Sequence, residues 1–375
     1  YMETGPMPSF EITATSGDAR VGKLSTSRHS LPTPTFMPVG TRGSVRTLTS
    51  TDLEELGADI ILGNTYHLML RPGETVIEQS GGIHGFADWN RLVLTDSGGY
   101  QIFSLQPDVD DDGVTFKSTY DGSFHRLTPQ NAVDIQCALG SDIQMALDVC
   151  PPLPSEKSVI EVAVERTKIW AGIAREHFIR RREAEGFERA QFGIVQGGVD
   201  LSLRRISAEQ IVDIGFDGYA IGGLSVGESR EDMIEPMVES LRTLPVDRPR
   251  YFMGLGDPAG LVEAVGVGVD MFDCVWPTRL ARHGTALTAA GRINLGAARY
   301  ANSQEPIDPD FPQSPAARWS RGYLRHLLSV GEPAAARILT LHNLAWLFDM
   351  MHRMRTAIEN DTFHKFRKDI LDVWA

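Results

Sequence analysis

The sequence predicts an α/β protein whose main unit is a (β/α)8 TIM barrel. Eight short apolar runs follow one another along the chain, and helix-length segments separate most of them. Nearly every run ends in a small, polar or acidic residue. Runs this short are typical of buried parallel strands, because half-exposed antiparallel strands alternate apolar with polar residues. Eight such strands are the number that closes this kind of barrel.

The predicted strands cover residues 36–41, 60–65, 92–99, 142–148, 192–198, 218–223, 251–256 and 271–277. A helix is predicted over 49–58, because the segment starts with capping hydroxyl residues, carries acids in its first turn and ends near Gly57. Apolar residues at i, i+3 and i+4 predict a long outer helix within 155–190.

Three further parts flank or interrupt the barrel. Residues 1–30 contain two strand-like runs around a Ser-Gly-Asp turn and are expected to close the bottom of the barrel. Residues 106–127 read as a β insertion on the opposite face. After the barrel, which we assign to 31–284, residues 285–375 predict an α-rich appendage with a hairpin, a proline-rich loop and helices within 319–330 and 334–360.

Composition limits the possible classes of protein. The chain has 375 residues, 42% of them hydrophobic, and no run long enough to span a membrane. Its start lacks the features of a secretory signal, and its three cysteines are far apart, so we expect a cytoplasmic protein. The net charge of −13 argues against a surface that binds nucleic acid everywhere. Residues 279–325 carry seven arginines against three acids, which suits either a solvated surface or an anion-binding one.

The ends of the predicted strands are where a barrel enzyme carries its reactive groups. The polar and glycine residues at these ends are Asp96, Asp148, Gln196, Gly222, Gly223 and Asp273. Two converging carboxylates permit a glycosyl-type displacement, in which one attacks an anomeric carbon and the other moves a proton. A third acid, an amide and exposed glycine N–H groups suit the edge of a planar heterocycle.

Six segments resemble, in order and spacing, the signature segments of the tRNA-guanine transglycosylases. They are TDSGGYQIFSL, DVCPP, GIVQGG, GYAIGGLSVGE, YFMGLGDP and MFDCVWPTRLARHG. The resemblance implies a cytoplasmic, homodimeric (β/α)8 glycosyltransferase of queuosine biosynthesis. Such an enzyme exchanges guanine at the wobble position of a tRNA anticodon loop for a 7-deazaguanine base. A base must leave its stack to enter an active site, which suits an unpaired anticodon loop.

The resemblance implies a role for each matching residue. Asp273 corresponds to the nucleophile that forms a covalent glycosyl-enzyme intermediate, and Asp96 to the general acid/base. Asp148, Gln196 and Gly223 correspond to groups that read the edge of the base, while Tyr100 and Met253 correspond to those that sandwich its ring. The full set of implied substrate-binding residues is Ser97, Gly98, Gly99, Tyr100, Asp148, Cys150, Gln196, Gly222, Gly223, Leu224, Val226 and Met253.

Two further inferences concern the substrates. Cys150 and Val226 resemble the bacterial pattern, which implies preQ1 (7-aminomethyl-7-deazaguanine) as the incoming base, although both also suit plain apolar packing. The segments GLGDPAG and TRLARHG resemble those that contact the tRNA, so Arg279 and Arg282 are expected to bind phosphates. The implied RNA-binding residues are Gly254, Leu255, Gly256, Asp257, Thr278, Arg279, Leu280, Ala281 and Arg282.

The sequence departs from the family at its structural zinc site, which is a C-x-C-x2-C cluster with a later histidine. Phe311, Gln313 and Ala316 stand at the three cysteine positions, and His342 is retained. One imidazole cannot form a closed tetrahedral site, so we predict that the appendage contains no metal and that the protein needs no cofactor. Instead, the appendage is expected to pack around Phe311 and Trp319.

Alternative functions remain open from the sequence. A second hypothesis is a related enzyme that inserts a 7-deazaguanine into DNA or another RNA, and the altered zinc loop is its best support. A non-catalytic tRNA-binding partner subunit is a third hypothesis, and retention of both Asp96 and Asp273 argues against it. Trp319, Tyr323 and His326 form an aromatic and polar stripe that suits either a subunit contact or a helix core.

Overall fold

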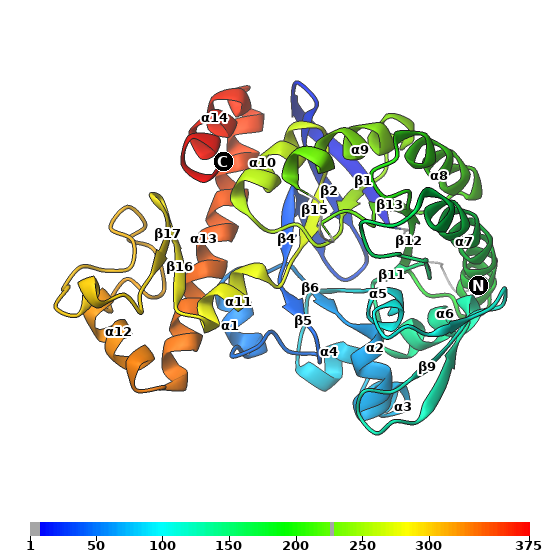
Figure 1. Cartoon of the computed structure of the whole chain (residues 1–375), viewed down its shortest axis with the longest axis horizontal. Helices are drawn as coiled ribbons and strands as arrows, with labels where there is room; N and C mark the ends of the chain where they lie inside the picture. The colour runs from blue at the N-terminus through cyan, green and yellow to red at the C-terminus, as the bar shows by residue number, and fades with distance from the viewer. Residues whose placement is uncertain (1–7, 226–228) are drawn as a thin grey trace.

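The computed structural model describes residues 8–225 and 229–375, and its largest sheet is a closed parallel barrel (Figure 1). The strand order is β4-β15-β14-β13-β12-β11-β7-β6-β5. The two end members, β4 (Thr35–Met37) and β5 (Val39–Gly40), are halves of one strand interrupted at Pro38, which has no N–H to donate. β4 pairs with β15 and β5 pairs with β6, so the sheet closes on itself. The predicted (β/α)8 barrel is confirmed.

The remaining barrel strands agree with the predicted runs but end earlier. They are β6 (Ile60–Gly63), β7 (Leu92–Thr95), β11 (Ile143–Met145), β12 (Ala190–Val195), β13 (Gly218–Ile221), β14 (Arg250–Phe252) and β15 (Met271–Asp273). Beyond each strand, the small and polar residues leave the sheet and form the loops at the barrel mouth. The prediction was wrong for Trp276 and Pro277, which begin helix α11 (Trp276–Arg282) instead of ending a strand.

Helices follow most strands and cover the outside of the barrel. They are α1 (Ser50–Glu55), α2 (Thr65–Leu68), α3 (Glu74–Gln79), α4 (Gly82–Ala87), α5 (Gly99–Phe103), α6 (Pro129–Ala138), α7 (Lys157–Glu185), α8 (Leu201–Ile214), α9 (Arg230–Thr243) and α10 (Pro258–Gly266), and the chain between α2 and α3 is kinked at Arg71, whose backbone is extended. Thr49 and Asp52 form the capping box that starts α1. The long helix α7 ends at Gly186, whose φ of 68° is the left-handed conformation that favours glycine.

A small antiparallel sheet covers the N-terminal end of the barrel. Its strands are β1 (Ser9–Ser16), β2 (Ala19–Ser25) and β3 (Ser30–Thr33). Leu24 and Leu31 pack into the apolar interior of the barrel. Arg20 Nε donates to Oδ1 of Asp270, the residue before β15, at 2.8 Å, and both side chains are buried. The bottom of the barrel is therefore closed, and access remains at the opposite end.

The β insertion is also confirmed. β8 (Asp108–Val109), β9 (Val114–Lys117) and β10 (Phe124–Leu127) form an antiparallel sheet in the order β10-β9-β8. The insertion lies between β7 and β11 in the chain, and therefore on the C-terminal face of the barrel.

After β15 and α11, the chain forms the α-rich appendage that Figure 1 shows in yellow and orange beside the barrel. It contains the hairpin β16 (Thr285–Thr288) and β17 (Gly291–Asn294), a 3-10 turn at Ala298–Tyr300, α12 (Arg321–Ser329), α13 (Pro333–Glu359) and α14 (Phe363–Trp374). The sequence prediction missed α14. It is separated from α13 by a short turn in which Asp361 has a φ of 53°.

Helix α13 connects the appendage to the barrel. Near its start, Ile338 and Leu339 pack in an apolar cluster with Leu324 of α12. Further along, Met350 and Met354 join the large core between the barrel and its outer helices. The appendage is thus fixed to the barrel by a continuous helix. Within residues 8–225 and 229–375, no helix is long and apolar enough to cross a membrane.

Candidate active site

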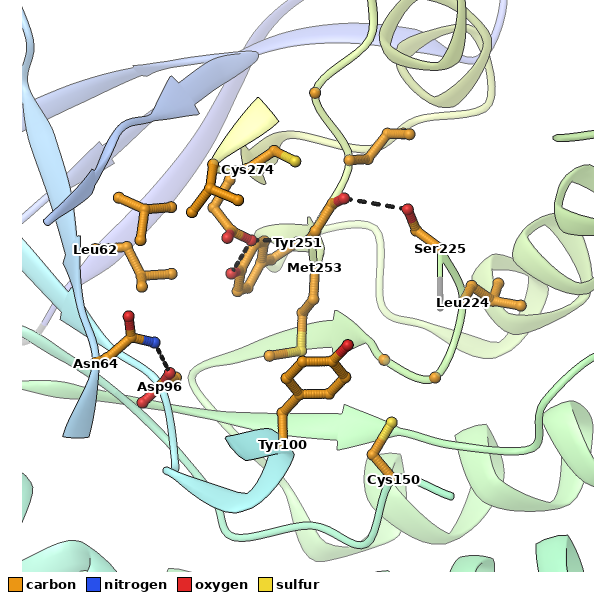
Figure 2. Close-up of a pocket in the computed structure, with 18 of the residues that line it drawn as sticks. Leu62, Asn64, Asp96, Tyr100, Cys150, Leu224, Ser225, Tyr251, Met253 and Cys274 are labelled. Atoms are coloured by element: carbon orange, nitrogen blue, oxygen red, sulfur yellow. Dashed lines mark hydrogen bonds between the residues drawn. The ribbon is translucent and has the colours of Figure 1, made fainter. Parts of the chain in front are cut away.

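A cavity of about 500 Å³ lies at the C-terminal ends of the barrel strands (Figure 2). The structure brings most of the predicted substrate-binding and catalytic residues to its wall. Those that line it are Asp96, Ser97, Tyr100, Asp148, Cys150, Gln196, Gly222, Gly223, Leu224, Met253 and Asp273. Each strand ends in a loop that carries only one or a few of these residues, so the closed barrel is what gathers them.

Asp273, the last residue of β15, lies at the cavity wall with one oxygen held in place. Its Oδ1 accepts a hydrogen bond from Tyr251 Oη at 2.6 Å and another from the Gly254 N–H at 2.9 Å. Burial raises the pKa of Asp273, and these two hydrogen bonds oppose the rise. Both bonds are to Oδ1, which leaves Oδ2 for a reacting atom.

Asp96 lies in the loop after β7, where the end of β6 holds it. Asn64 donates a hydrogen bond to Oδ2, and the backbone N–H groups of Thr65 and Gly98 donate to Oδ1 at 2.8 and 3.2 Å. Burial nevertheless raises the pKa of Asp96 to about 6, and the negative charge of Asp273 adds to the rise. A carboxyl group with this pKa can both release and accept a proton near neutral pH.

A third carboxylate, Asp148, forms a buried pair with Gln196. Gln196 Nε2 donates to Oδ2 at 2.7 Å, and Ser97 Oγ donates to Oδ1 at 3.1 Å. Burial raises the pKa of Asp148 to about 6. Gln196 Oε1 is buried and has no hydrogen-bond partner within the described part of the chain. A buried acceptor left without a donor is a position where a ligand N–H compensates the loss of water.

The Gly222-Gly223 turn beside this pair has no room for side chains. A Cβ atom on Gly223 would lie 2.2 Å from Gln196 Oε1, and one on Gly222 would lie 2.7 Å from Ile194 Cγ2. Gly223 also has a φ of 65°. Glycine at both positions therefore lets the backbone itself form the wall of the cavity.

Two large side chains project into the cavity from opposite sides. Figure 2 shows Met253, which follows β14, and Tyr100, from α5, extending toward one another. The Tyr100 side chain is 58% exposed, so its ring is open to the cavity mouth. Burial raises the pKa of the nearby Cys150 thiol to about 12, which makes it a neutral wall residue and a poor nucleophile.

The predicted RNA-binding residues divide into three groups. Gly254, Leu255, Gly256, Asp257 and Arg279 line the cavity. Arg282 is half-buried. Burial lowers the pKa of its guanidinium most, and the positive charges of Arg46 and Arg279 lower it further.

Thr278 and Ala281 are buried, so their side chains contact protein, while Leu280 packs partly against the core. Helix α11 therefore presents Arg279 to the cavity, Arg282 donates to Thr278 Oγ1 at 3.3 Å, and the buried small residues anchor the helix. Gly98 and Gly99 are not among the residues that line the cavity. The Gly98 N–H donates a hydrogen bond to Asp96. Val226 lies outside the described residues.

Several lining residues were missed by the sequence analysis. Asn64 and Tyr251 contact the two predicted catalytic carboxylates, and Leu62, Ser225 and Trp276 complete parts of the wall. Asn64 is the residue before the end of the predicted strand 60–65, and this place near the barrel mouth could have identified it. Tyr251 lies within an apolar run and resembles a core residue, because only the fold shows that its hydroxyl reaches Asp273.

Two of the three positions of the missing zinc cysteines, Phe311 and Ala316, are buried, whereas Gln313 is exposed. His342 is buried: its Nε2 donates to the Leu287 carbonyl at 2.7 Å, and its Nδ1 therefore accepts from Ser314 Oγ at 2.8 Å. Burial lowers the pKa of His342 to about 4, so the ring is neutral. Phe311 packs edge-on to it with 6.0 Å between ring centroids.

These residues do not fit a zinc ion, because both imidazole nitrogens are already used and the neighbours supply no thiolate. Within the described residues, no group of three or more His, Cys, Asp or Glu side chains is arranged to hold a metal.

The arrangement can support displacement at a carbon atom without a metal. One half-buried carboxylate with a free oxygen faces the same cavity as a second carboxyl group whose pKa is about 6. The third carboxylate, the amide and the glycine backbone lie beside them and can fix a flat polar molecule.

Comparisons with known proteins agree with this geometry. A family profile described as queuine tRNA-ribosyltransferase matches residues 15–375. The chain is 49% identical over 368 residues to the queuine tRNA-ribosyltransferase of Thermotoga neapolitana, with 98% of each chain covered. It is 47% identical over 366 residues to that of Sphingopyxis alaskensis, with 97% of each covered. It is 46% identical over 355 residues to that of Halothermothrix orenii, with 94% of each covered.

Proposed function

Since the chain belongs to the queuine tRNA-ribosyltransferase family and is a tRNA-guanine transglycosylase, we propose that it exchanges guanine at the anticodon wobble position for preQ1 through a covalent intermediate on Asp273. Such an enzyme is a pentosyltransferase. The observation that carries the proposal is the pair Asp273 and Asp96, two half-buried carboxyl groups on one cavity, each held by its own set of donors.

The chemistry proceeds in two displacements. Asp273 Oδ2 attacks ribose C1′ while the C1′–N9 bond breaks, and the bonding electrons leave with guanine, which takes a proton from Asp96. PreQ1 then enters the same position and gives its N9 proton to Asp96. Its nitrogen attacks C1′, the bond to Asp273 breaks, and both carboxyl groups return to their starting forms. The pKa of about 6 at Asp96 suits a group that must both give and accept this proton.

The base is read along its edge and held by its faces. Asp148 accepts from the ring N–H and exocyclic amino group, which 7-deazaguanine shares with guanine, while backbone N–H groups near Gly223 donate to the 6-oxo group. Tyr100 and Met253 cover the two faces of the ring. Cys150 is a small neutral wall residue, which favours a base with a short 7-substituent. It therefore supports preQ1, and not the larger queuine, as the incoming base.

The RNA is held at the mouth of the cavity. Arg279 lies at the cavity edge and Arg282 one helical turn further along α11, where both bind phosphates of the anticodon loop. The proposed location is cytoplasmic, where tRNA is found, and the free state of Cys137, Cys150 and Cys274 agrees with a reducing compartment.

We further propose that the enzyme is a homodimer and that its appendage contains no zinc. Tyr323 on α12 is 46% exposed, and an exposed aromatic of this size suits a subunit contact together with Trp319 and His326. In place of a metal, the appendage is stabilised by the hydrogen bonds of His342 to Ser314 and Leu287 and by the buried Phe311.

The test is exchange of radiolabelled guanine into tRNA and into DNA, followed by displacement with unlabelled preQ1. The proposal predicts incorporation into tRNA only, and loss of the label when preQ1 is added. Incorporation into DNA would favour the alternative of a DNA-modifying enzyme, and no incorporation into either would favour a non-catalytic partner subunit. Retained label in the presence of preQ1, with displacement by queuine, would overturn the assigned base.

A further inference from the structure

Arg204 is a buried arginine that contacts the backbone of two active-site loops. It lies in the first turn of α8, and its side chain has no solvent exposure. Its Nε donates to the Gly198 carbonyl at 2.7 Å, and Nη1 donates to the Val195 carbonyl at 3.1 Å. Both acceptors flank Gln196 in the loop after β12.

The same guanidinium reaches the neighbouring strand end. Nη1 donates to the Gly222 carbonyl at 2.7 Å, and Nη2 donates to the Gly223 carbonyl at 3.1 Å. The planar guanidinium group of Arg204 thus connects the loop that carries Gln196 to the turn that forms the cavity wall. Arginine is suited to this task because its donors are fixed in one plane, whereas the lysine ammonium is a single point.

These contacts determine where the N–H groups of the turn point. The described part of the chain has cis peptide bonds only before prolines, so the Gly222–Gly223 and Gly223–Leu224 peptides are trans. In a planar trans peptide the C=O and N–H bonds point in opposite directions. Because the carbonyls of Gly222 and Gly223 face Arg204, the N–H groups of Gly223 and Leu224 face away from it.

The cavity lies on that opposite side. Gly223 and Leu224 both line it. Cys150 lies in the same wall, and a backbone hydrogen bond from the Gly223 N–H to its thiol lowers the pKa of Cys150, against the larger rise caused by burial. Paired glycines have the most backbone freedom of any residues, so without an external contact these peptides would rotate.

We propose that Arg204 is a positioning residue that fixes these two N–H groups toward the 6-oxo group of the incoming base. This inference rests on the proposed function, since it assigns the donors for that base. Arg204 touches neither the base nor the reacting atoms. Its effect is on base recognition, through the orientation of the Gly222–Leu224 backbone.

The experiment compares 7-deazaguanine with its counterpart in which hydrogen replaces the 6-oxo group, each as an inhibitor of guanine exchange into tRNA. The counterpart also lacks the ring N–H that Asp148 accepts, but this loss is the same in every variant, so the change in preference between variants reports on the donors to the 6-oxo group. The variants are Arg204→Lys and Arg204→Met. The control is Arg175→Lys, which alters a buried arginine of α7 that donates to the Gly215 carbonyl and to Asp217 and does not line the cavity.

We expect wild-type enzyme to prefer the 6-oxo compound, and Arg204→Lys to reduce that preference about tenfold, the value of one lost hydrogen bond. The KM for tRNA should change less than about twofold. Arg175→Lys should lower the melting temperature and keep the wild-type preference. A folded Arg204→Lys enzyme with an unchanged preference would overturn the proposal.

A second measurement does not depend on a variant that folds. A crystal structure of wild-type enzyme with 7-deazaguanine should show the Gly223 N–H within hydrogen-bond distance of the 6-oxo group, with both glycine carbonyls on Arg204. A turn rotated away from Arg204 in that complex would contradict the inference. Absence of guanine exchange by the wild-type enzyme would instead refute the proposed function, so the two failures are distinguishable.

Discussion

Tyr251 Oη donates a hydrogen bond of 2.6 Å to Asp273 Oδ1 inside the barrel mouth. Burial raises the pKa of the Tyr251 hydroxyl well above its usual value, so the group stays protonated and remains a donor. A permanent donor on one carboxylate oxygen stabilises the ionised form of Asp273 and fixes which oxygen faces the substrate.

The first prediction concerns this contact. Tyr251→Phe removes a hydrogen bond that lowers the pKa of Asp273, so that pKa should rise. The rate of covalent adduct formation should fall about 10- to 100-fold near neutral pH, the range for a hydrogen bond to a charged group, and partly recover as pH rises. Single-turnover rates between pH 5.5 and 9 measure this. An unshifted pH profile would show that Tyr251 does not lower the pKa of Asp273.

The second prediction concerns the stability cost of Asp148. Its folded-state pKa of about 6 lies above the ordinary value of 3.8. Between these values the folded state holds more protons than the unfolded state, so the free energy of unfolding falls as pH rises from about 4 to about 6. The asparagine of the Asp148→Asn variant cannot ionise, so this variant should be more stable than wild type at pH 8 by about 1 to 3 kcal/mol. It should also no longer bind the base.

Denaturant unfolding at pH 8 and pH 4 checks this. The stability difference should be present at pH 8 and mostly lost at pH 4, where Asp148 is protonated in the folded state and about half protonated in the unfolded state. An Asp148→Asn enzyme that is less stable than wild type at pH 8 would show that the carboxylate is compensated in the fold.

The third prediction concerns RNA contacts by α11. Arg279→Gln combined with Arg282→Gln should raise the KM for tRNA and reduce the slope of log KM against log salt by about 1.4, since each lost single-strand phosphate contact removes about 0.7. The KM for preQ1 should not change. Arg248→Gln is the matched control, because Arg248 lies at the N-terminal end of the barrel beside Arg20. Equal salt slopes in both variants would exclude Arg279 and Arg282 as phosphate ligands.

The fourth prediction concerns the appendage. Purified enzyme should contain no stoichiometric zinc, and EDTA should not change its melting temperature. His342→Ala should lower stability by about 2 to 4 kcal/mol, because it leaves the Leu287 carbonyl and Ser314 without partners in a buried cluster. Elemental analysis and thermal unfolding with and without EDTA measure these effects. One zinc per chain, or a large loss of stability in EDTA, would overturn the metal-free assignment.

The barrel could be predicted because its signal is local. Short apolar runs such as residues 60–65 and 92–99 need only their own composition to indicate buried strands, and the residues that end them identify one face of the barrel. The same logic placed Asp96, Asp148, Gln196 and Asp273 around a single mouth, where the structure has them. Their roles came from resemblance, because spacing alone does not distinguish a nucleophile from a proton donor.

What the sequence did not reveal depends on contacts between distant segments. Arg204 is buried without exposure because four carbonyls from two loops surround it, and an arginine in an amphipathic helix otherwise suggests a solvent-facing position. Helix α14 was missed because one turn around Asp361 separates it from a much longer helix. The hydrogen bond of His342 to Ser314 likewise joins residues that no sequence pattern connects.

The most direct test of the central claim is trapping of the covalent RNA adduct on a denaturing gel. Wild-type enzyme should form an adduct with tRNA, and Asp273→Asn should form none while it keeps the wild-type melting behaviour and tRNA binding. Asp96→Asn, which retains the nucleophile, serves as the comparison. An undiminished adduct with Asp273→Asn would show that another residue attacks the ribose and would refute the mechanism.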